Sequence, residues 1–295
     1  MELAPPQLGV EGEPESVHRP NWQVNRLVEA DCLTAMAQIP DHSVHLVLCD
    51  LPYGTTANPW DSVIPLDALW EQYRRVLHPD GVVVLTGQGP FTARLILSNE
   101  AWFKYKLCWI KSKPTNFLNS SHQPLRRHED ICIFARKRGR YFAQMQAGTA
   151  YDKGVRKNQQ TGSYGTMTPS RVQTAGARHP TDVVYFKTAE SEGPVWHPTQ
   201  KPVALGRYLV RTHSLPGEVV LDNAFGSGSF LVAALLEGRN YYGIERNAES
   251  RLFREQPTDF VKVARERLSQ ARAGLGERQA GWLAGGLAGA LPHGT

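Results

Sequence analysis

The chain has 295 residues, of which 41% are hydrophobic and 21% are charged. This composition fills a hydrophobic core and excludes a wholly disordered chain, and no apolar run is long enough to span a membrane. The net charge of +5 is unevenly spread, because residues 101–160 hold 13 basic and 3 acidic residues. Such clustering is typical of a protein that binds a polyanion, although a solvated basic surface explains it equally well.

Both ends of the chain differ in composition from the middle. Residues 1–20 are polar and proline-rich, without the apolar segment of a secretory signal, and residues 271–295 are rich in glycine and alanine. Each is expected to be a flexible tail. The four cysteines show neither a disulfide framework nor the spacing of a zinc site, which predicts a cytoplasmic location and no metal: Cys32, Cys49, Cys108 and Cys132.

Between the tails, short apolar segments alternate with helical patterns. Strands are predicted at Val44–Cys49, 82–85, 103–110, 131–134, 218–221 and 241–244, and helices at 66–77, 202–213, 230–237 and from about 258. This alternation predicts an α/β fold with a doubly wound, Rossmann-like parallel sheet.

Residues 136–196 interrupt this alternation. They are dense in glycine, threonine, serine, glutamine and basic residues and contain few apolar runs. They are therefore expected to be an insertion into a domain formed by residues 21–135 and 197–270.

The turn that follows the strand Val44–Cys49 carries an acid and an aromatic residue. It reads Asp50-Leu51-Pro52-Tyr53-Gly54 and lies at the edge of the sheet where α/β proteins bind ligands. The Asp50 carboxylate and the carbonyls beside the rigid Pro52 are acceptors, and Tyr53 offers a flat face. This set suits a planar ring with an exocyclic amine, yet an ordinary Pro-Gly turn explains the segment better when it is taken alone.

A glycine-rich turn lies between the predicted strand at 218–221 and the next helix. Gly226 and Gly228 allow a tight turn and a close approach to a ligand. The following strand ends at Glu245, whose carboxylate can accept hydrogen bonds from ribose hydroxyls. The layout predicts a nucleoside-cofactor site, with a purely structural turn as the alternative. The loop lacks both the third glycine of a dinucleotide fingerprint and the Lys-Ser/Thr pair of a phosphate loop.

Together these two segments resemble the amino-methyltransferases of DNA, which use S-adenosylmethionine. Asp50-Leu51-Pro52-Tyr53 is similar to the family's D/N/S-P-P-Y/F/W signature, and residues 222–229 are similar to its D-P-F-x-G-S-G-T cofactor loop. The catalytic motif precedes the cofactor loop, as in the permuted β group. Four further segments agree: residues 30–33, 70–81, 128–130 and 197–202, the last reading His-Pro-Thr-Gln-Lys-Pro.

The resemblance covers residues 26–268 and departs from the family at two positions. Leu51 and Asn223 stand where proline is usual. The carbonyl of Leu51 remains, so the set of acceptors should survive. Residues 54–61 and 118–131 look most like phage- and prophage-encoded members.

The resemblance implies a role for each residue of the site. Residues Asp31, Asp50, Thr199, Lys201, Asp222, Phe225, Gly226, Ser227, Gly228, Ser229 and Glu245 are expected to bind S-adenosylmethionine. Among them, Phe225–Ser229 would wrap its methionine part, Thr199 and Lys201 its carboxylate, Glu245 its ribose and Asp31 its adenine.

The catalytic residues implied are Asp50, Pro52 and Tyr53. A flipped base would stack on Tyr53, and its amine hydrogens would be held by Asp50 and by the carbonyl of Leu51 or Pro52. The amine would then attack the methyl group directly, with no metal and no covalent enzyme intermediate. His128 and Glu129 are not expected to form a metal pair, because adjacent residues on a strand face opposite ways.

The favoured function is methylation of adenine N6 in double-stranded DNA, with residues 136–196 as the target-recognition insertion. The alternative is cytosine N4, although those enzymes more often carry serine at the position of Asp50. Methylation of RNA or of a protein glutamine, and a non-catalytic DNA-binding module, are the remaining alternatives. A homodimer and a restriction endonuclease are the partners considered besides DNA.

Overall fold

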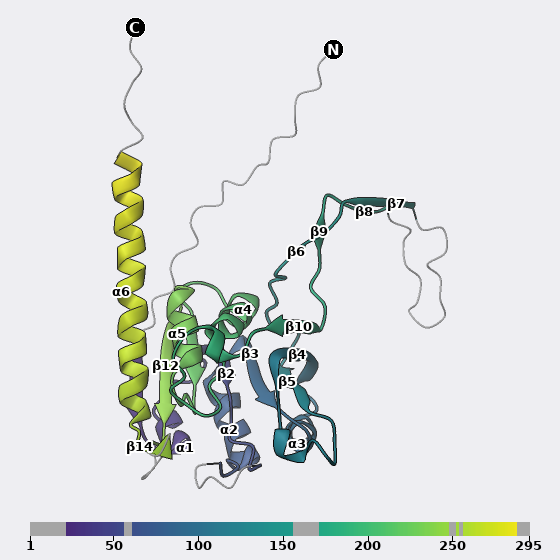
Figure 1. Ribbon diagram of the computed structural model, residues 1–295. Coiled ribbons are helices and arrows are strands. Elements are labelled where there is room, and N and C mark those ends of the chain that lie inside the picture. Colours follow the sequence, from purple (N-terminus) through teal and green to yellow (C-terminus); the bar gives the residue numbers. More distant parts are fainter. Residues whose placement is uncertain (1–21, 56–60, 156–170, 248–251, 254–255, 288–295) are drawn as a thin grey trace, which may run out of the picture.

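The computed structural model describes residues 22–55, 61–155, 171–247, 252–253 and 256–287 (Figure 1). The N-terminal tail predicted at residues 1–20 lies outside these ranges. A mixed eight-stranded sheet forms the centre of the protein. Across the sheet the strands are β1 Arg26–Glu29, β12 Asn240–Glu245, β11 Val219–Asp222, β2 Val44–Cys49, β3 Leu77–Gly87, β5 Arg126–Phe134, β4 Phe103–Thr115 and β10 Val183–Phe186.

β5 runs in the opposite direction to the other strands of the sheet, and this decides which strand ends lie together. β5 pairs antiparallel with both β3 and β4, whereas the other neighbouring pairs are parallel. The carboxyl ends of β2, β3, β4, β11 and β12 therefore lie at one edge, together with the amino end of β5. We call this the carboxyl edge and the opposite one the amino edge.

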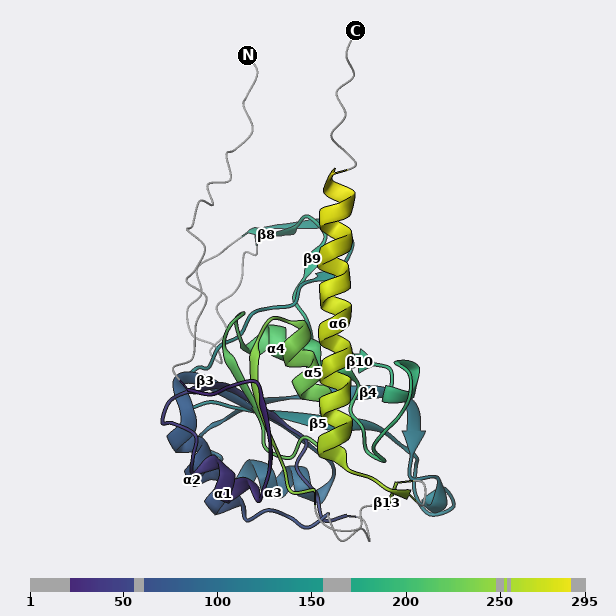
Figure 2. The same cartoon turned by 90° about the vertical axis from the view of Figure 1, so that its left-hand side faces the viewer.

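Helices cover both faces of the sheet (Figure 2). On one face lie α1 Cys32–Met36, α2 Leu66–Val76 and α3 Pro90–Ser98, and on the other α4 Val203–His213, α5 Ser229–Leu236 and α6 Phe260–Leu287. Side chains alternate along each strand, so Leu46 and Leu48 pack toward α4 and α5 while Val47 and Cys49 pack toward α2. Two hydrophobic cores result, which confirms the α/β, doubly wound architecture.

β10 lies within the predicted insertion, residues 136–196, but belongs to the central sheet. Residues 143–179 of the insertion form an arm. Within it, β6 Gln146–Ala147 pairs with β9 Ala177–Arg178, and β7 Tyr151–Val155 pairs with β8 Arg171–Thr174. Because β5 ends and β10 begins at the amino edge, the arm, residues 143–179, leaves and rejoins the body at that edge. Figure 1 shows it rising away from the start of α6, which follows the carboxyl end of β12.

The C-terminal segment differs from its prediction. α6 continues to Leu287, so residues 271–287 are helical where the glycine- and alanine-rich composition predicted a flexible tail. Alanine is the strongest helix former, and it outweighs the interspersed glycines here. Residues 288–295 lie outside the described part of the chain.

The remaining elements are short. A 3-10 turn, η1 Phe117–Asn119, connects β4 to β5, and a second, η2 Ala189–Ser191, follows β10. β13 Leu252–Phe253 and β14 Gln256–Pro257 form a small hairpin before α6. Of the helices in the described ranges, none combines the length and the apolar character that crossing a membrane requires.

Candidate functional site

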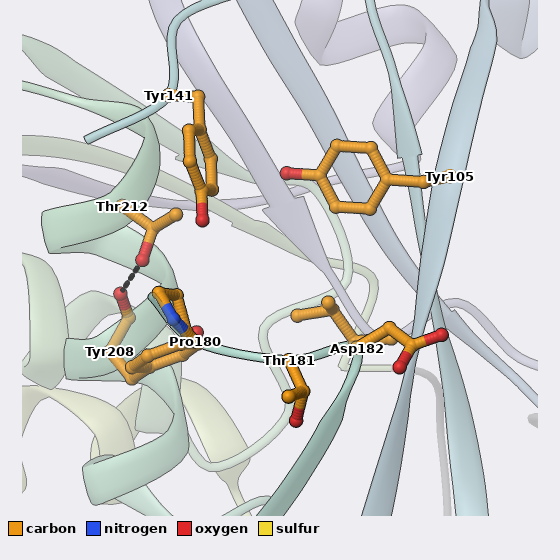
Figure 3. A pocket seen from close by; sticks show the side chains of 8 residues that line it. Tyr105, Tyr141, Pro180, Thr181, Asp182, Tyr208 and Thr212 are labelled. Carbon is orange, nitrogen blue, oxygen red and sulfur yellow. Dashed lines mark hydrogen bonds between the residues drawn. The ribbon is translucent and has the colours of Figure 1, made fainter. Parts of the chain in front are cut away.

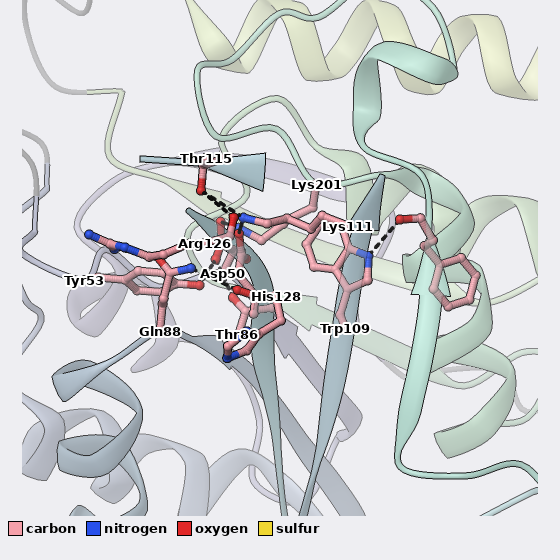
Figure 4. A network of polar contacts seen from close by, with 12 residues as sticks. Asp50, Tyr53, Thr86, Gln88, Trp109, Lys111, Thr115, Arg126, His128 and Lys201 are labelled. Carbon is pink, nitrogen blue, oxygen red and sulfur yellow. Dashed lines mark hydrogen bonds and ion pairs between the residues drawn. The ribbon is translucent and has the colours of Figure 1, made fainter. Parts of the chain in front are cut away.

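The carboxylate of Asp50 is held at the carboxyl end of β2 by three donors (Figure 4). Tyr53 donates its hydroxyl hydrogen to Oδ1 at 2.8 Å, and Thr86 at the end of β3 donates to the same oxygen. Lys201 approaches Oδ2 at 2.5 Å. A carboxylate has about four acceptor positions, so three donors leave room for one more.

The turn after Asp50 holds an aromatic ring in place. Tyr53 stacks on Phe91 at the start of α3, with ring centroids 4.8 Å apart. Asp61 closes the turn by accepting hydrogen bonds from the backbone of Gly54 and Thr55, both at 2.9 Å. The structure thus brings Asp50, Pro52 and Tyr53 together as one rigid turn. Burial raises the pKa of Tyr53 and nearby Asp50 adds to this effect, so the phenol keeps its proton.

Lys201 joins Asp50 to a second carboxylate that the sequence had not linked to the site. Its ammonium lies 3.3 Å from Glu129 Oε2, and Lys111 lies 3.1 Å from Glu129 Oε1. Lys201 and Lys111 are only 7% and 4% exposed. Two buried cations therefore balance two carboxylates, which is how proteins keep charges away from water.

The pKa of Lys201 follows from these neighbours. Burial alone lowers the pKa of the Lys201 ammonium, but the charges of Asp50 and Glu129 outweigh burial and raise it above its ordinary value. Lys201 therefore carries a positive charge directed at Asp50. The sequence predicted a contact with the carboxylate of the cofactor, and that role stays a prediction.

The glycine loop, residues 225–229, forms a second cluster at the carboxyl edge. Gly226 and Gly228 have φ angles of +51° and +77°, which non-glycine residues rarely adopt. The backbone N–H of Gly226 donates to Glu245 Oε2 at 2.7 Å, and that of Asn247 donates to Oε1 at 3.1 Å. The loop and the Glu245 carboxylate therefore hold each other in position. The ring of Phe225 packs into the core beneath the loop.

Arg267 of α6 fixes the same loop from outside. Its Nη1 donates to the carbonyl of Ser227 at 2.6 Å, to Ser227 Oγ at 3.0 Å and to Ser229 Oγ at 3.1 Å. Burial lowers the pKa of Arg267 to about 10, with Glu192 acting in the opposite direction, so the guanidinium stays charged at neutral pH. No motif had pointed to this residue.

Two predicted acids flank the loop. Asp31 caps α1 by accepting from the backbone of Leu33 and Thr34, and it follows β1, whose Glu29 pairs with Glu245. Asp222 is buried at the end of β11 and accepts from the backbone of Ala224. Burial raises the pKa of Asp222 to about 8. Asp31 is thus exposed, whereas Asp222 is buried.

The segment 197–201 connects the two clusters. His197 packs against Gly226 and stacks edge-on with Phe260 of α6, at a centroid distance of 4.6 Å. Gln200 accepts a hydrogen bond from Ser227 Oγ at 3.2 Å, while Lys201 reaches Asp50. Thr199 stays exposed, with its hydroxyl 3.1 Å from His197 Nδ1. One short segment therefore bridges the glycine loop and the turn that carries Asp50.

A separate cavity of about 310 Å³ lies at the amino edge, at the base of the arm (Figure 3). Tyr105 at the start of β4, Tyr141, Pro180 and Tyr208 of α4 contribute to its lining. The cavity lies at the edge of the sheet opposite Asp50 and contains none of the predicted site residues.

Comparison with known proteins identifies the class. The family described as DNA methylase, which groups N6 and N4 methyltransferases, matches residues 44–251, and the chain belongs to this family. It is a β-group amino-methyltransferase of DNA that uses S-adenosylmethionine. Type II methyltransferase M.HinfI of Haemophilus influenzae is 24% identical over 280 residues, which cover 84% of this chain and 69% of the relative.

Solved structures share the fold at low sequence identity. M1.HpyAVI in complex with S-adenosylmethionine gives a TM-score of 0.55 at 18% identity, covering 82% of this chain and 98% of that one. The cytosine-N4-specific PvuII DNA methyltransferase gives 0.53 at 14% identity, covering 81% and 92%. A putative DNA modification methylase of Thermus thermophilus, solved with S-adenosylmethionine, gives 0.53 at 20% identity, covering 84% and 94%.

Proposed function

We propose that the protein transfers a methyl group from S-adenosylmethionine to the exocyclic N6 of adenine in double-stranded DNA. The carboxylate of Asp50 carries this proposal, because it is held by Thr86, Tyr53 and Lys201 and keeps about one free acceptor position. An adenine amine, flipped out of the duplex, supplies the matching donor. Aspartate at this position favours adenine over cytosine.

The residues present suit the cofactor. The glycine loop approaches a ligand through backbone alone, and Glu245, already oriented by two N–H groups, can accept further hydrogen bonds from ribose hydroxyls. Asp31 is exposed beside it and is available to the adenine of the cofactor. When bound, S-adenosylmethionine supplies an electrophilic methyl group.

The chain's own residues then orient the target amine. Asp50 accepts one amine hydrogen and a backbone carbonyl of Leu51 or Pro52 accepts the other, which turns the nitrogen lone pair out of the ring plane. The fixed charge of Lys201 holds the Asp50 carboxylate in place. Catalysis then rests on positioning and electrostatics. Burial raises the pKa of Cys32 to about 11 and of Cys132 to about 12, so neither supplies a thiolate nucleophile.

The arm adds contacts to DNA phosphates under this proposal. Residues 143–179 hold five basic residues and one acidic residue. Because the described part of the arm, residues 143–155 and 171–179, departs from the amino edge, we assign it to DNA binding and not to the pocket of the flipped base. A cytoplasmic location agrees with the four free cysteines. A homodimer and an endonuclease partner remain predictions.

Mass spectrometry of the product tests the proposed function. The protein is incubated with labelled S-adenosylmethionine and unmethylated duplex DNA, and the nucleosides are then analysed. We expect N6-methyladenine, while N4-methylcytosine alone would overturn the choice of base. Label in RNA or protein but not in duplex DNA would overturn the substrate. DNA binding without methyl transfer would indicate a non-catalytic module.

Replacing Asp50 by alanine tests the catalytic assignment. The Asp50→Ala variant should lose methyl transfer by roughly a hundredfold or more, as is usual when a preorganised electrostatic group is removed. Cofactor affinity, measured by calorimetry, should stay largely unchanged, because Asp50 acts mainly on the target base. A transfer rate near that of the wild type would contradict its role.

A further inference from the structure

Two adjacent large apolar side chains project into solvent near the start of the loop between β4 and β5, residues 116–125, in which Leu125 is also exposed. Phe117 is 74% exposed and Leu118 is 81% exposed. Removing apolar side chains of this size from water is favourable in free energy. Exposed apolar residues next to each other mark a surface that meets a partner.

Hydrogen bonds hold the backbone of the loop that carries these side chains. Asn116 adopts a left-handed conformation with φ +70°, and the side-chain amide of Asn119 donates to Asn116 Oδ1 at 2.7 Å. The backbone of Ser120 bonds to the carbonyl of Phe117 at 3.1 Å. Asparagine tolerates the left-handed region better than most residues, so the sequence favours this turn at the tip of the loop, residues 116–120.

The base of the loop is tied to the catalytic turn. Thr115 and Arg126 pair across the two strands at the carboxyl edge. Arg126 donates to Gln88 at 2.8 Å, and Gln88 lies two residues after Thr86, which holds Asp50. Figure 4 shows Arg126 and Gln88 close to Asp50 and Tyr53. The tip therefore projects beyond the same edge of the sheet as the site.

The charge around the tip suits one kind of partner. Residues 112–128 contain three basic residues and no acidic residue. Lys113, Arg126 and Arg127 are all exposed, on the strands that flank the tip. Apolar side chains between basic ones match a nucleic-acid duplex, in which charged phosphates flank stacked bases.

We propose that Phe117 and Leu118 enter the DNA duplex at the target step and occupy the space that the flipped base leaves. The inference rests on the proposed function. Flipping removes one base from the stack and exposes the neighbouring bases, and an apolar wedge covers these faces while Lys113 and Arg127 contact the phosphates. The wedge then stabilises the opened duplex, whereas Asp50 and Tyr53 hold the flipped base.

The test compares two DNA substrates that carry the target base in the same recognition site. Sequencing of modified DNA from an expressing host first identifies this site. In one, the target is paired normally. In the other, it faces an abasic position, so that opening no longer breaks a base pair. The Phe117→Ala/Leu118→Ala double variant should show a roughly tenfold or greater loss of kcat/KM on the paired duplex, and close to wild-type activity opposite the abasic position.

Matched variants separate a wedge from a general loss of apolar surface. Leu97 of α3 is 73% exposed, which is close to the exposure of Phe117. Leu97→Ala should leave kcat/KM on both substrates unchanged. Phe117→Leu keeps an apolar wedge and should retain most of the activity. The salt dependence of DNA binding should stay the same in the double variant, because every basic residue is still present.

Three results would overturn the inference while leaving the proposed function intact. The double variant could have the kcat/KM of the wild type on the paired duplex, or it could lose activity equally on both substrates. It could also show a lower cofactor affinity in calorimetry. The proposed function fails by a different result, namely that the wild-type protein methylates no duplex at all. Fluorescence of 2-aminopurine at the target position gives an independent measure, with a smaller signal expected in the double variant.

Discussion

At the scale of single residues, Lys201 determines the charge balance of the site. It contacts Asp50 at 2.5 Å and Glu129 at 3.3 Å. Replacing it by methionine leaves Asp50 without its cation, close to Glu129, which keeps Lys111. Removing one partner of a buried ion pair typically costs about 3–5 kcal/mol, and the partial exposure of Asp50 reduces that cost here. We expect Lys201→Met to lower both the free energy of unfolding and the rate of methyl transfer.

A double variant distinguishes these two effects. Adding Glu129→Gln to Lys201→Met removes the repulsion between the two carboxylates, while the new amide oxygen can still accept from Lys111, and this should recover part of the lost stability. It should not recover methyl transfer, because Asp50 still lacks its cation. Denaturant unfolding and labelled methyl transfer measure the two quantities. Recovery of transfer together with stability would mean that Lys201 acts only on folding.

Asp222 makes the folded protein sensitive to pH. Burial raises its pKa to about 8 from an ordinary 3.8, so between these values the folded state binds more protons than the unfolded state. The free energy of unfolding should therefore fall as pH rises through this window and level off above pH 8, with a slope of at most about 1.4 kcal/mol per pH unit.

The Asp222→Asn variant should show a flatter profile, because it cannot ionise. Unfolding by denaturant is measured without cofactor from about pH 7 to pH 8.5. Burial lowers the pKa of His213 to about 4, so its titration changes stability mainly at lower pH. Equal slopes for both proteins would show that Asp222 does not retain its proton.

Sequence patterns identified the site residues that lie in short motifs. They missed the residues that contact the site from other strands of the sheet. Asp50, Tyr53, Gly226 and Glu245 stand in recognisable spacings at the ends of predicted strands. Thr86 and Glu129 reach Asp50 and Lys201 only because β3 lies beside β2 in the sheet and β5 lies beside β3. Strand order is a tertiary property that the local pattern does not contain.

At the scale of elements, α6 supports the glycine loop, residues 225–229, from outside. Arg267 makes three hydrogen bonds to Ser227 and Ser229. Because these bonds hold the loop in its left-handed turns, Arg267→Met should weaken cofactor binding by roughly tenfold, as expected for the loss of charged hydrogen bonds. Calorimetry with S-adenosylmethionine measures the change.

A matched control lies on the same helix. Arg265 is exposed, and Arg265→Met should leave cofactor affinity unchanged. Lysine at position 267 keeps the charge but loses the forked geometry of arginine, so Arg267→Lys should fall between the wild type and Arg267→Met. If Arg265→Met and Arg267→Met weaken binding equally, the helix acts through its overall charge.

The direction of β5 explains why the sequence did not predict at which end of the strands the insertion leaves the sheet. Its apolar residues match any strand of a doubly wound sheet, and periodicity does not distinguish a parallel from an antiparallel strand. Because β5 runs antiparallel, the chain after Phe134 emerges at the amino edge. The position of the arm opposite the site depends on this single reversal.

At the scale of the whole molecule, the arm is separable from the catalytic body. Its strands pair with one another, and its ends lie together at the cavity lined by Tyr141 and Pro180. Replacing residues 143–179 by a short glycine-serine linker should therefore leave the melting temperature and the cofactor affinity close to those of the wild type.

DNA binding should change in the same variant. Removal of a net charge of +4 should lower DNA affinity and make its logarithmic salt dependence shallower by roughly two to four units, since each phosphate contact contributes about 0.9. A second variant, Lys153→Gln/Arg156→Gln/Lys157→Gln, removes charge and retains the length of the chain. Filter binding at several salt concentrations measures both variants. An unchanged slope would show that the arm does not touch DNA, and recognition would then fall to the carboxyl edge, where the β4–β5 loop projects.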